Sequence, residues 1–262
     1  MMYFILTFFF GAAVGSFVNV LIDRTIAGQD WVRGRSHCDH CKKNLAWYDL
    51  IPILSFAFYG GKSRCCKIPL SYQYPVVEIL VGLLFVWWIA VGFWFFQLVT
   101  APLIFIQPAF WLFTGILLMI LGLADLFYGV VLLNIVWFGA IMTIVYRLIL
   151  WHYGAYQLVD LQSSILLSGA FFAFFWLLWK MTKGRGMADG DMYIALYMGL
   201  ILGWPKGLVA LMGSFILGAI VGVLLIVTKI KGRHETVPFV PFMIVAMGVA
   251  MLWGEKIINY VY

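Results

Sequence analysis

The sequence predicts an all-α polytopic membrane protein of about eight transmembrane helices, with a small cytoplasmic Cys-rich insert after the first helix. Of its 262 residues, 65% are hydrophobic and 11% are charged, and the mean hydropathy is +1.01. A soluble domain is closer to half apolar, with about a quarter of its residues charged. All four cysteines lie in one long polar segment. These observations indicate one membrane domain, not a soluble enzyme with an anchor.

The transmembrane spans follow from the uncharged runs, because a bilayer core of about 30 Å needs roughly 20 apolar residues for each crossing. Residues 1–22 lack the basic start and cleavage site of a signal peptide, so we expect a retained helix there. The uncharged run 79–124 is too long for one crossing, and Pro102 and Pro108 divide it. The sixth span is short, which indicates a half-helix or a tilted helix. The expected spans are 2–22, 75–96, 103–124, 130–150, 163–181, 191–204, 207–228 and 238–253.

The polar insert covers residues 23–73 and separates the first span, 1–22, from the membrane core, 74–262. The insert is too small to form a normal hydrophobic core without a disulfide or a bound metal. A C-x-x-C pair followed by two more cysteines is typical of a structural zinc site, and cytoplasmic thiols stay reduced. Vicinal cysteines do not form a second C-x-x-C knuckle, so free or redox-active thiols remain an alternative, and His40 is a substitute ligand. The expected metal ligands are Cys38, Cys41, Cys65 and Cys66.

The net charge of +6 comes mainly from basic clusters in residues 24–67, 180–185 and 229–233. Basic loops beside anionic lipid explain this charge without a nucleic-acid partner. By the positive-inside rule these loops face the cytoplasm, so eight spans place both termini on the non-cytoplasmic side. The loops after the third and fifth spans then also face the cytoplasm. Asp125 and Asp191 are therefore expected on the same membrane face.

Two acidic sites stand out against the apolar background. Asp125 is the only charged residue in 79–146, and Asp189-Gly190-Asp191 opens another apolar segment. A carboxylate at mid-membrane costs roughly 2.5–3.5 kcal/mol on insertion scales, so it usually marks a functional site. Two such carboxylates suit aspartyl proteolysis, in which a protonated acid polarises the peptide carbonyl and an ionised one activates water.

Each carboxylate also has a simpler interpretation. Asp125 would pair with a cation from another helix or cap a helix, and Asp191 would be the N-cap of the helix that follows it. The pair also suits a proton relay in a proton-coupled transporter or assembly factor. The sequence has no His-Glu-x-x-His motif and no Gly-x-Ser-Gly in an apolar helix, which disfavours metalloprotease and serine-protease chemistry.

Several motifs, spread over nearly the whole chain, resemble those of the bacterial type IV prepilin peptidases, also called leader peptidase/N-methyltransferases. The Trp-Tyr-Asp-Leu-Ile-Pro run is the most specific of them. The matching segments are Gly15-Ser-Phe-Val-Asn19-Val-Leu-Ile-Asp-Arg24, Arg35-Ser-His-Cys38-Asp-His-Cys41, Leu45-Ala-Trp47-Tyr48-Asp49-Leu-Ile-Pro52-Ile-Leu-Ser55, Tyr74-Pro75-Val-Val-Glu78 and Gly190-Asp191-Met-Tyr-Ile-Ala-Leu-Tyr-Met-Gly199-Leu-Ile-Leu-Gly203-Trp204.

The resemblance implies a GxGD-type intramembrane aspartyl protease of the bacterial inner membrane. It would cut the basic leader from prepilin or pseudopilin precursors of a type IV pilus or type II secretion system at the cytoplasmic face. Many members then methylate the new N-terminus with S-adenosylmethionine. The family's catalytic aspartates map to Asp125 and Asp191, with Asp189 as a second candidate. For methyl transfer we expect Glu78 and Gly82, although a helix-terminal Glu and a packing glycine explain them equally well.

The chain departs from the family pattern at several sites, among them Gln73 in place of an Arg and Leu132-Leu133-Asn134 in place of L-P-D. Two further departures concern the acidic pair and the cysteines. The first glycine of G-x-G-D is replaced by Ala188, which costs little unless that position needs a positive φ. The second cysteine pair of the family is C-x-x-C, whereas this chain has Ser63-Arg64-Cys65-Cys66. The second departure makes zinc binding and methyl transfer the less secure expectations.

Overall fold

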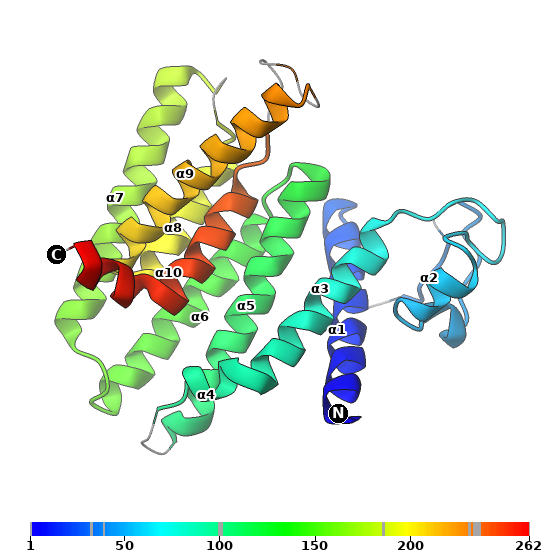
Figure 1. Ribbon diagram of the computed structural model, residues 1–262, viewed down its shortest axis with the longest axis horizontal. Helices are drawn as coiled ribbons and strands as arrows, with labels where there is room; N and C mark the ends of the chain where they lie inside the picture. The colour runs from blue at the N-terminus through cyan, green and yellow to red at the C-terminus, as the bar shows by residue number, and fades with distance from the viewer. Residues whose placement is uncertain are drawn as a thin grey trace. The chain divides into compact units, whose positions relative to one another are not determined.

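Seven helices among the described residues are long and apolar enough to cross a membrane, and one further apolar helix is shorter. The structure is a computed structural model that describes residues 2–31, 34–38, 40–98, 102–184, 187–229, 232 and 237–261. These helices correspond in order to the eight expected spans, and the short one is the expected sixth (Figure 1). The predicted all-α membrane fold is confirmed. By its internal packing the chain divides into two units, Met1–Ile116 and Leu117–Tyr262, each described by itself.

The first unit is built on a pair of helices that flank the Cys-rich insert in sequence. Helix α1 (Met2–Ile26) packs along α3 (Gln73–Trp87). Helix α3 continues through a π-helical turn, η2 (Trp88–Gly92), into α4 (Phe93–Phe95). The insert contains two short helices that the sequence analysis did not predict, η1 (Trp47–Leu50) and α2 (Leu54–Phe58). Helix α5 (Leu103–Tyr128) starts directly after Pro102, contains Pro108 and crosses the boundary between the units.

Glycines bring α1 and α3 into close contact. A Cβ on Gly15 would lie 2.8 Å from the Cα of Glu78, and one on Gly11 would lie 3.0 Å from the Cα of Gly82. On the other side of the contact, a Cβ on Gly82 would lie 2.8 Å from the ring of Phe8. Small residues spaced by four let helix backbones approach each other in membranes, where packing and not the hydrophobic effect drives association. The α1–α3 pair therefore depends on these glycines.

The second unit surrounds one short helix with longer ones. Helix α8 (Gly190–Leu202) contacts α6 (Leu133–His152), α7 (Leu158–Thr182), α9 (Lys206–Val227) and α10 (Val240–Val261). At 1.5 Å per residue, 13 residues span about 20 Å, less than a bilayer core. Most of its residues are buried, including Met192, Tyr197 and Met198. Helix α8 is thus the expected half-helix, enclosed by protein.

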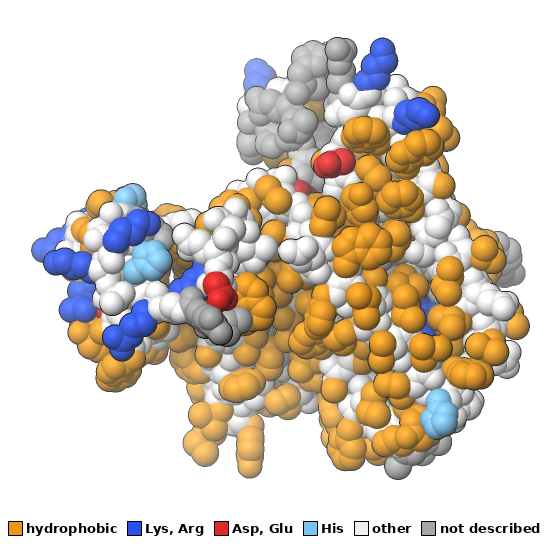
Figure 2. All heavy atoms as spheres, turned by 180° about the vertical axis from the view of Figure 1, so that it is seen from behind, with side chains coloured by type: hydrophobic (Ala, Val, Ile, Leu, Met, Phe, Trp, Pro, Cys, Tyr) orange, Lys and Arg blue, Asp and Glu red, His pale blue; other side chains and the backbone are white. Residues whose placement is uncertain are grey.

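Charge and exposure agree with a membrane protein. Figure 2 shows apolar side chains over much of the face that it presents, whereas Lys and Arg side chains gather on the insert and, in the second unit, mostly at one end. Three exposed lysines of the second unit lie at the ends of α7 and α9, at positions 180, 183 and 229, and a fourth, Lys256, lies on α10. Of the expected basic clusters, Arg33, Arg185, Lys231 and Arg233 lie outside the described residues.

We predict that Gly15→Ala destabilises the protein while Gly115→Ala does not. The new Cβ at position 15 meets the backbone of α3, and such overpacking typically costs about 1–3 kcal/mol. At position 115 the nearest atom is a Leu84 methyl at 3.7 Å, and Ala favours a helix over Gly by about 1 kcal/mol. Thermal unfolding in detergent should show a lower midpoint only for Gly15→Ala. Equal midpoints would contradict the close packing of α1 on α3.

Candidate functional site

Asp125 lies in the last turns of α5 and is buried, with 6% of its surface exposed. Its Oδ2 accepts a hydrogen bond of 3.2 Å from the backbone N–H of Val240, the first residue of α10. A carboxylate near the C-terminal end of its own helix meets an unfavourable dipole, whereas a helix N-terminus favours negative charge. The start of α10 therefore stabilises this carboxylate, and Asp125 does cap a helix, as its simpler interpretation expected.

Asp191 is the second residue of α8, and only 4% of its surface is exposed. The N-cap position of α8 belongs to Asp189, so the interpretation of Asp191 as the N-cap is wrong. The charge of Asp125 acts electrostatically on Asp191, which shows that the two carboxylates share one local environment. The described residues include no Lys or Arg that forms an ion pair with either carboxylate. The structure thus brings the two predicted acidic residues together without a counter-cation from the part of the chain that it describes.

Asp189 differs from the other two carboxylates in its exposure. Its side chain is exposed, and it makes no capping hydrogen bond to α8. Its charge acts on Asp191, although more weakly than that of Asp125. Asp189 is therefore close to the site but not enclosed with the buried pair.

The segment between α5 and α6 fixes the approach of the two acidic residues. The chain turns at Gly129, whose φ is +65°, a conformation that favours glycine. Val131 then packs on the start of α8, where a Cβ on Gly190 would lie 2.4 Å from a Val131 methyl carbon. Only glycine fits at position 190 without a shift of this segment. Ala188 does not have a positive φ, so the loss of the family's first glycine causes no backbone strain.

The opposite end of α8 is held by a buried arginine that the sequence analysis left unassigned. Arg147 of α6 donates a hydrogen bond of 2.9 Å to the carbonyl of Ile201 and further hydrogen bonds to Tyr156 and Ser164. A cation at a helix C-terminus interacts favourably with the helix dipole. In the sequence, Arg147 is an isolated charged residue between apolar spans, and this could have identified it as a residue with a structural or functional role. Arg147 therefore anchors the helix that carries Asp191.

The Cys-rich insert forms two backbone knuckles with identical hydrogen-bond spacing. In the first, the Cys38 N–H donates to the Lys43 carbonyl, and the Lys42 N–H donates to the Cys38 carbonyl. In the second, Ser63 takes the place of Cys38 and makes the equivalent bonds with Ile68 and Lys67. The residues three positions further on are Cys41 and Cys66. The second knuckle thus forms despite the vicinal cysteines, contrary to our expectation, because Ser63 fills its first position.

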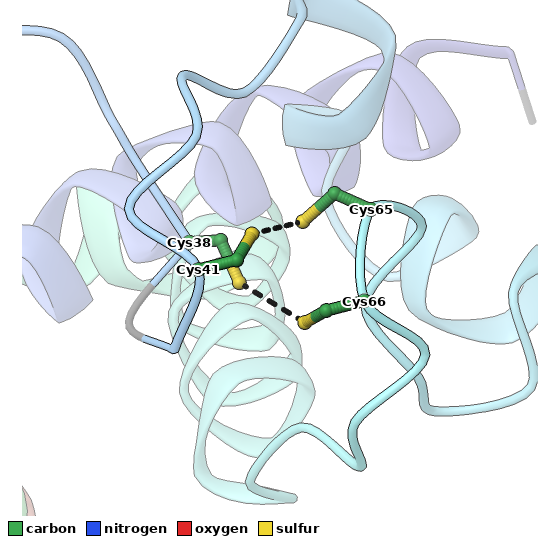
Figure 3. Close-up of side chains that lie close together, drawn as sticks. All are labelled: Cys38, Cys41, Cys65 and Cys66. Carbon is green, nitrogen blue, oxygen red and sulfur yellow. Dashed lines mark hydrogen bonds between the residues drawn. The ribbon is translucent and has the colours of Figure 1, made fainter.

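The four thiols converge between these knuckles (Figure 3). Their Sγ atoms all lie within 4.8 Å of one another, with 3.7 Å between Cys38 and Cys66 and 2.9 Å between Cys41 and Cys65. All four are free cysteines, and the Sγ of Cys65 lies 3.1 Å from the Ser63 hydroxyl. Cys65 therefore supplies the thiol that Ser63 lacks. The cluster could hold a metal ion, and His40 is exposed and not part of it.

The local hydrogen bonds prepare one of these thiols for metal binding. The backbone N–H of Cys41 and the hydroxyl of Ser63 lower the pKa of the Cys38 thiol to about 6. A neighbouring thiol, that of Cys65, raises the pKa of Cys41 to about 11. Because a thiolate and not a thiol ligates metals, Cys38 is the ligand that is already largely ionised at neutral pH.

Glu78 and Gly82, one turn apart on α3, lie in different surroundings. Glu78 is buried, and its Oε2 accepts a hydrogen bond of 2.7 Å from the backbone N–H of Ile53. Ile53 has a φ of +62°, a strained conformation for a β-branched residue. Gly82 packs against α1 instead. Glu78 thus anchors the insert to α3, and Gly82 sets the distance between the helices.

Comparisons with known proteins agree with this architecture. The family model described as Bacterial Peptidase A24 N-terminal domain matches residues 9–92, which contain most of α1, the whole insert, and all of α3 and η2. Proteins named "Prepilin leader peptidase/N-methyltransferase" match over most of the chain. The chain is therefore similar to prepilin leader peptidases over most of its length. No solved structure gives a significant match.

Three relatives show the extent of this similarity. The prepilin leader peptidase of Myxococcus xanthus is 32% identical over 87% of this chain, and the match spans 65% of the relative. Those of Aeromonas hydrophila and Bacillus subtilis are 27% and 28% identical over 99% and 97% of this chain. The last two matches span 93% and 95% of the relatives. The similarity to prepilin leader peptidases therefore includes both units of the fold.

We predict that Gly190→Ala lowers the stability of the folded protein and that adding Val131→Ala restores most of the loss. The single change pushes a Cβ into the Val131 methyl, at a typical cost of about 1–3 kcal/mol. The double variant removes the clashing methyls. A double-mutant cycle, built from the melting temperatures of the wild type, the two single variants and the double variant, measures the coupling between positions 190 and 131. Additive effects would contradict the packing of residues 129–132 on α8.

Proposed function

We propose that this protein is an intramembrane aspartyl peptidase that removes the basic leader peptide of prepilin or pseudopilin precursors at the cytoplasmic face of the bacterial inner membrane. The observation that carries the proposal is the buried pair Asp125 and Asp191, which interact with each other and have no cation partner among the described residues. The names of the relatives supply the substrate class.

In the proposed mechanism one carboxylate acts as the base and the other as the acid. The Val240 N–H and the start of α10 stabilise negative charge on Asp125, so we assign it the ionised role. Asp125 takes a proton from water, whose oxygen bonds to the scissile carbonyl carbon. Protonated Asp191 donates a hydrogen bond to the carbonyl oxygen. The tetrahedral intermediate then collapses, the C–N bond breaks, and the leaving amine takes up the proton that Asp125 removed from water. Asp189 remains the second candidate for the role of Asp191.

The substrate and location follow from the charge distribution and the relatives. The partners are the lipid bilayer and a precursor whose basic leader stays in the cytoplasm, and no nucleic acid takes part. The basic loops support an orientation with the active site at the cytoplasmic face and both termini on the other side. A proton-coupled transporter or assembly factor remains the alternative use of the carboxylates, but the relatives' names favour peptide hydrolysis.

For the cysteine cluster we propose a structural zinc ion held by Cys38, Cys41, Cys65 and Cys66. A tetrahedral site with Zn–S bonds of about 2.3 Å has S···S edges of about 3.8 Å. The Cys38–Cys66 distance of 3.7 Å agrees with this, whereas the sulfurs of Cys41 and Cys65, 2.9 Å apart, would have to separate when the ion binds. A closed four-thiolate site is typical of structural zinc. The ion would join the two knuckles, and the insert would otherwise have few apolar contacts to hold it together.

We also propose that the protein methylates the new N-terminus after cleavage. When bound, S-adenosylmethionine would supply the methyl group to the new N-terminal amine, whose proton would pass to solvent. Glu78, which lies on α3, would take part directly in this methyl transfer. Gly82 acts through the contact of α3 with α1, which sets the position of Glu78.

Exchanging either buried aspartate for asparagine should abolish leader cleavage, with the cleavage rate lowered about a thousandfold or more. The reason is that Asp125 supplies the base and Asp191 the acid, and neither residue can take over the role of the other. The measurement is cleavage of a purified prepilin in detergent, with product masses determined by mass spectrometry. Asp160→Asn, at an exposed position on α7, is the matched control and should cleave normally. Full cleavage by Asp125→Asn would refute the proposal. Cleavage retained only by Asp191→Asn would move its role to Asp189.

Zinc content should depend on the thiol that Cys65 supplies. We expect about one zinc ion per chain, a clear loss in Cys65→Ser, and recovery in the double variant Ser63→Cys/Cys65→Ser, which rebuilds a C-x-x-C knuckle. Metal analysis by mass spectrometry gives the stoichiometry, and His40→Ala should keep its zinc. Wild-type protein isolated from zinc-containing medium without zinc would contradict the structural-metal proposal.

A further inference from the structure

The two short helices of the Cys-rich insert carry exposed apolar side chains on one side. Trp47 and Leu50 lie three positions apart in η1, and Leu54 and Phe58 lie four positions apart in α2. These spacings place each pair on the same side of its helix, because η1 is a 3₁₀-helix and α2 an α-helix. All four residues are exposed, Trp47 to 77% and Phe58 to 84%. We call these four residues the η1–α2 face.

The charged residue of η1 lies on the inner side of the helix. The Asp49 side chain is only 6% exposed, and it accepts hydrogen bonds of 2.8 and 3.0 Å from the Arg64 guanidinium. Its Oδ2 also accepts a hydrogen bond of 3.0 Å from the Ala46 N–H. A helix at a water-facing surface usually exposes its charged residues and buries its apolar ones. Because η1 does the reverse, the medium outside the η1–α2 face is apolar.

Contacts with α3 set the depth of α2 relative to the bilayer. Helix α3 begins a candidate membrane span at Gln73, and Tyr72, the residue before it, is 76% exposed. The ring of Tyr72 contacts that of Phe56 in α2, with 5.6 Å between the centroids. Directly before α2, the Ile53 N–H donates to Glu78, which lies about 7 Å along α3 from its first residue. Helix α2 therefore lies beside the first turns of a membrane span.

The length of this span places α2 at the edge of the hydrocarbon. The span has 23 residues, or about 34 Å, which is only slightly more than a bilayer core of about 30 Å. Its first turns consequently lie where the lipid headgroups meet the acyl chains. Aromatic rings favour this boundary. An exposed face that contains Trp47 and Phe58 is suited to the same depth.

The insert has the charge that an anionic membrane surface attracts. Residues 40–72 contain five Lys or Arg but only one acidic residue, Asp49, which is paired with Arg64. The lysines are all exposed: Lys42, Lys43, Lys62 and Lys67. In Figure 2 the insert, on the left, shows Lys and Arg side chains on its outer side and apolar side chains along its lower edge. Apolar faces flanked by basic residues are typical of structures that lie in the surface of anionic membranes.

We propose that the folded insert lies on the bilayer surface where α1 ends and α3 begins, with the η1–α2 face inserted at the boundary between headgroups and acyl chains. The exposed lysines interact with the headgroups of anionic phospholipids around this contact. Because α1 and α3 already tether both ends of the insert to the membrane, the contact forms at a high effective concentration. It holds the two knuckles at a fixed height over the bilayer. This inference does not depend on the proposed peptidase or methyl transfer.

A precursor protein is the alternative occupant of the η1–α2 face. The precursors named in the proposed function have basic leaders, which the lysines of the insert would repel. Like charges disfavour a protein contact, whereas anionic lipid complements these lysines. The observations therefore favour the bilayer.

The test is photocrosslinking of the full-length protein in nanodiscs that contain a phospholipid with a diazirine near the glycerol end of one acyl chain. Trypsin cuts after Lys43 and Lys62, so residues 44–62 are released as one peptide that contains the whole η1–α2 face. Mass spectrometry measures the fraction of this peptide that carries lipid. We expect lipid on the peptide in nanodiscs rich in phosphatidylglycerol, and severalfold less in nanodiscs of phosphatidylcholine alone.

Three variants identify the residues that make the contact. Trp47→Gln/Phe58→Gln should lower the lipid-bearing fraction about tenfold, because it removes both aromatic rings of the face. Lys42→Gln/Lys67→Gln keeps both trypsin sites and should lower the fraction severalfold in the phosphatidylglycerol nanodiscs only. His40→Ala changes an exposed residue of the first knuckle outside the face and should crosslink like the wild type.

The melting temperature in detergent, measured on the same samples, shows whether each variant is folded. Loss of lipid from the peptide of the folded aromatic variant supports the inference. If that variant melts at a lower temperature, Phe58→Gln alone, at the most exposed position of the face, decides in the same way.

Three results would overturn the inference. The first is a wild-type peptide 44–62 without lipid while peptides from the transmembrane helices carry it. The second is equal crosslinking of the wild type and the aromatic variant; if this variant also binds a prepilin more weakly, the face is a precursor-binding surface. The third is equal crosslinking in both kinds of nanodisc, which would contradict the role of the lysines.

Discussion

The second unit depends on the burial of Asp125 and Asp191 together, inside an apolar helical unit and with no cation partner among the described residues. Burying a carboxylate is costly unless hydrogen bonds or opposite charges compensate. Here the compensation comes from the backbone, because the start of α10 donates its Val240 N–H to Asp125. The N-terminus of α8 similarly provides a favourable dipole for Asp191. A counter-cation would stabilise both carboxylates as ions and leave no acid for catalysis, so two helix N-termini serve a peptidase better than a salt bridge.

Close packing converts this electrostatic arrangement into a defined geometry. Helix α8 is enclosed by four longer helices, its start is fixed by the contact of Gly190 with Val131, and its end is held by Arg147. The first unit uses the same device, because Gly15 and Gly82 bring α1 and α3 together and so place Asn19 and Glu78 beneath the insert. In both units a glycine permits close packing, against backbone in the first unit and against the Val131 side chain in the second, and a polar residue of the site lies near it.

Much of this fold could be predicted from the sequence, because uncharged runs and prolines define membrane helices directly. The spans, the short sixth helix and the shared location of Asp125 and Asp191 required only hydrophobicity and charge. The contact of Asp125 with Val240 could not be predicted, since it depends on how helices 115 residues apart in sequence pack. The knuckles were misjudged for a similar reason. Vicinal Cys65 and Cys66 hide a repeated backbone pattern in which Ser63 stands at the position of Cys38, and only the hydrogen bonds reveal it.

The central claim is that Asp125 and Asp191 hold one tetrahedral intermediate between them. The most direct measurement is the affinity of a peptide that carries a hydroxyethylene group in place of the scissile bond, determined for the wild type, Asp125→Asn, Asp191→Asn and the double variant. Transition-state analogues bind about 10²-fold or more tightly than substrates through groups that act in the reaction. The account predicts that each single variant loses most of this affinity and that the double variant loses little more, because the residues act as a unit. Unchanged affinity in either single variant, or independent additive losses, would contradict a shared site.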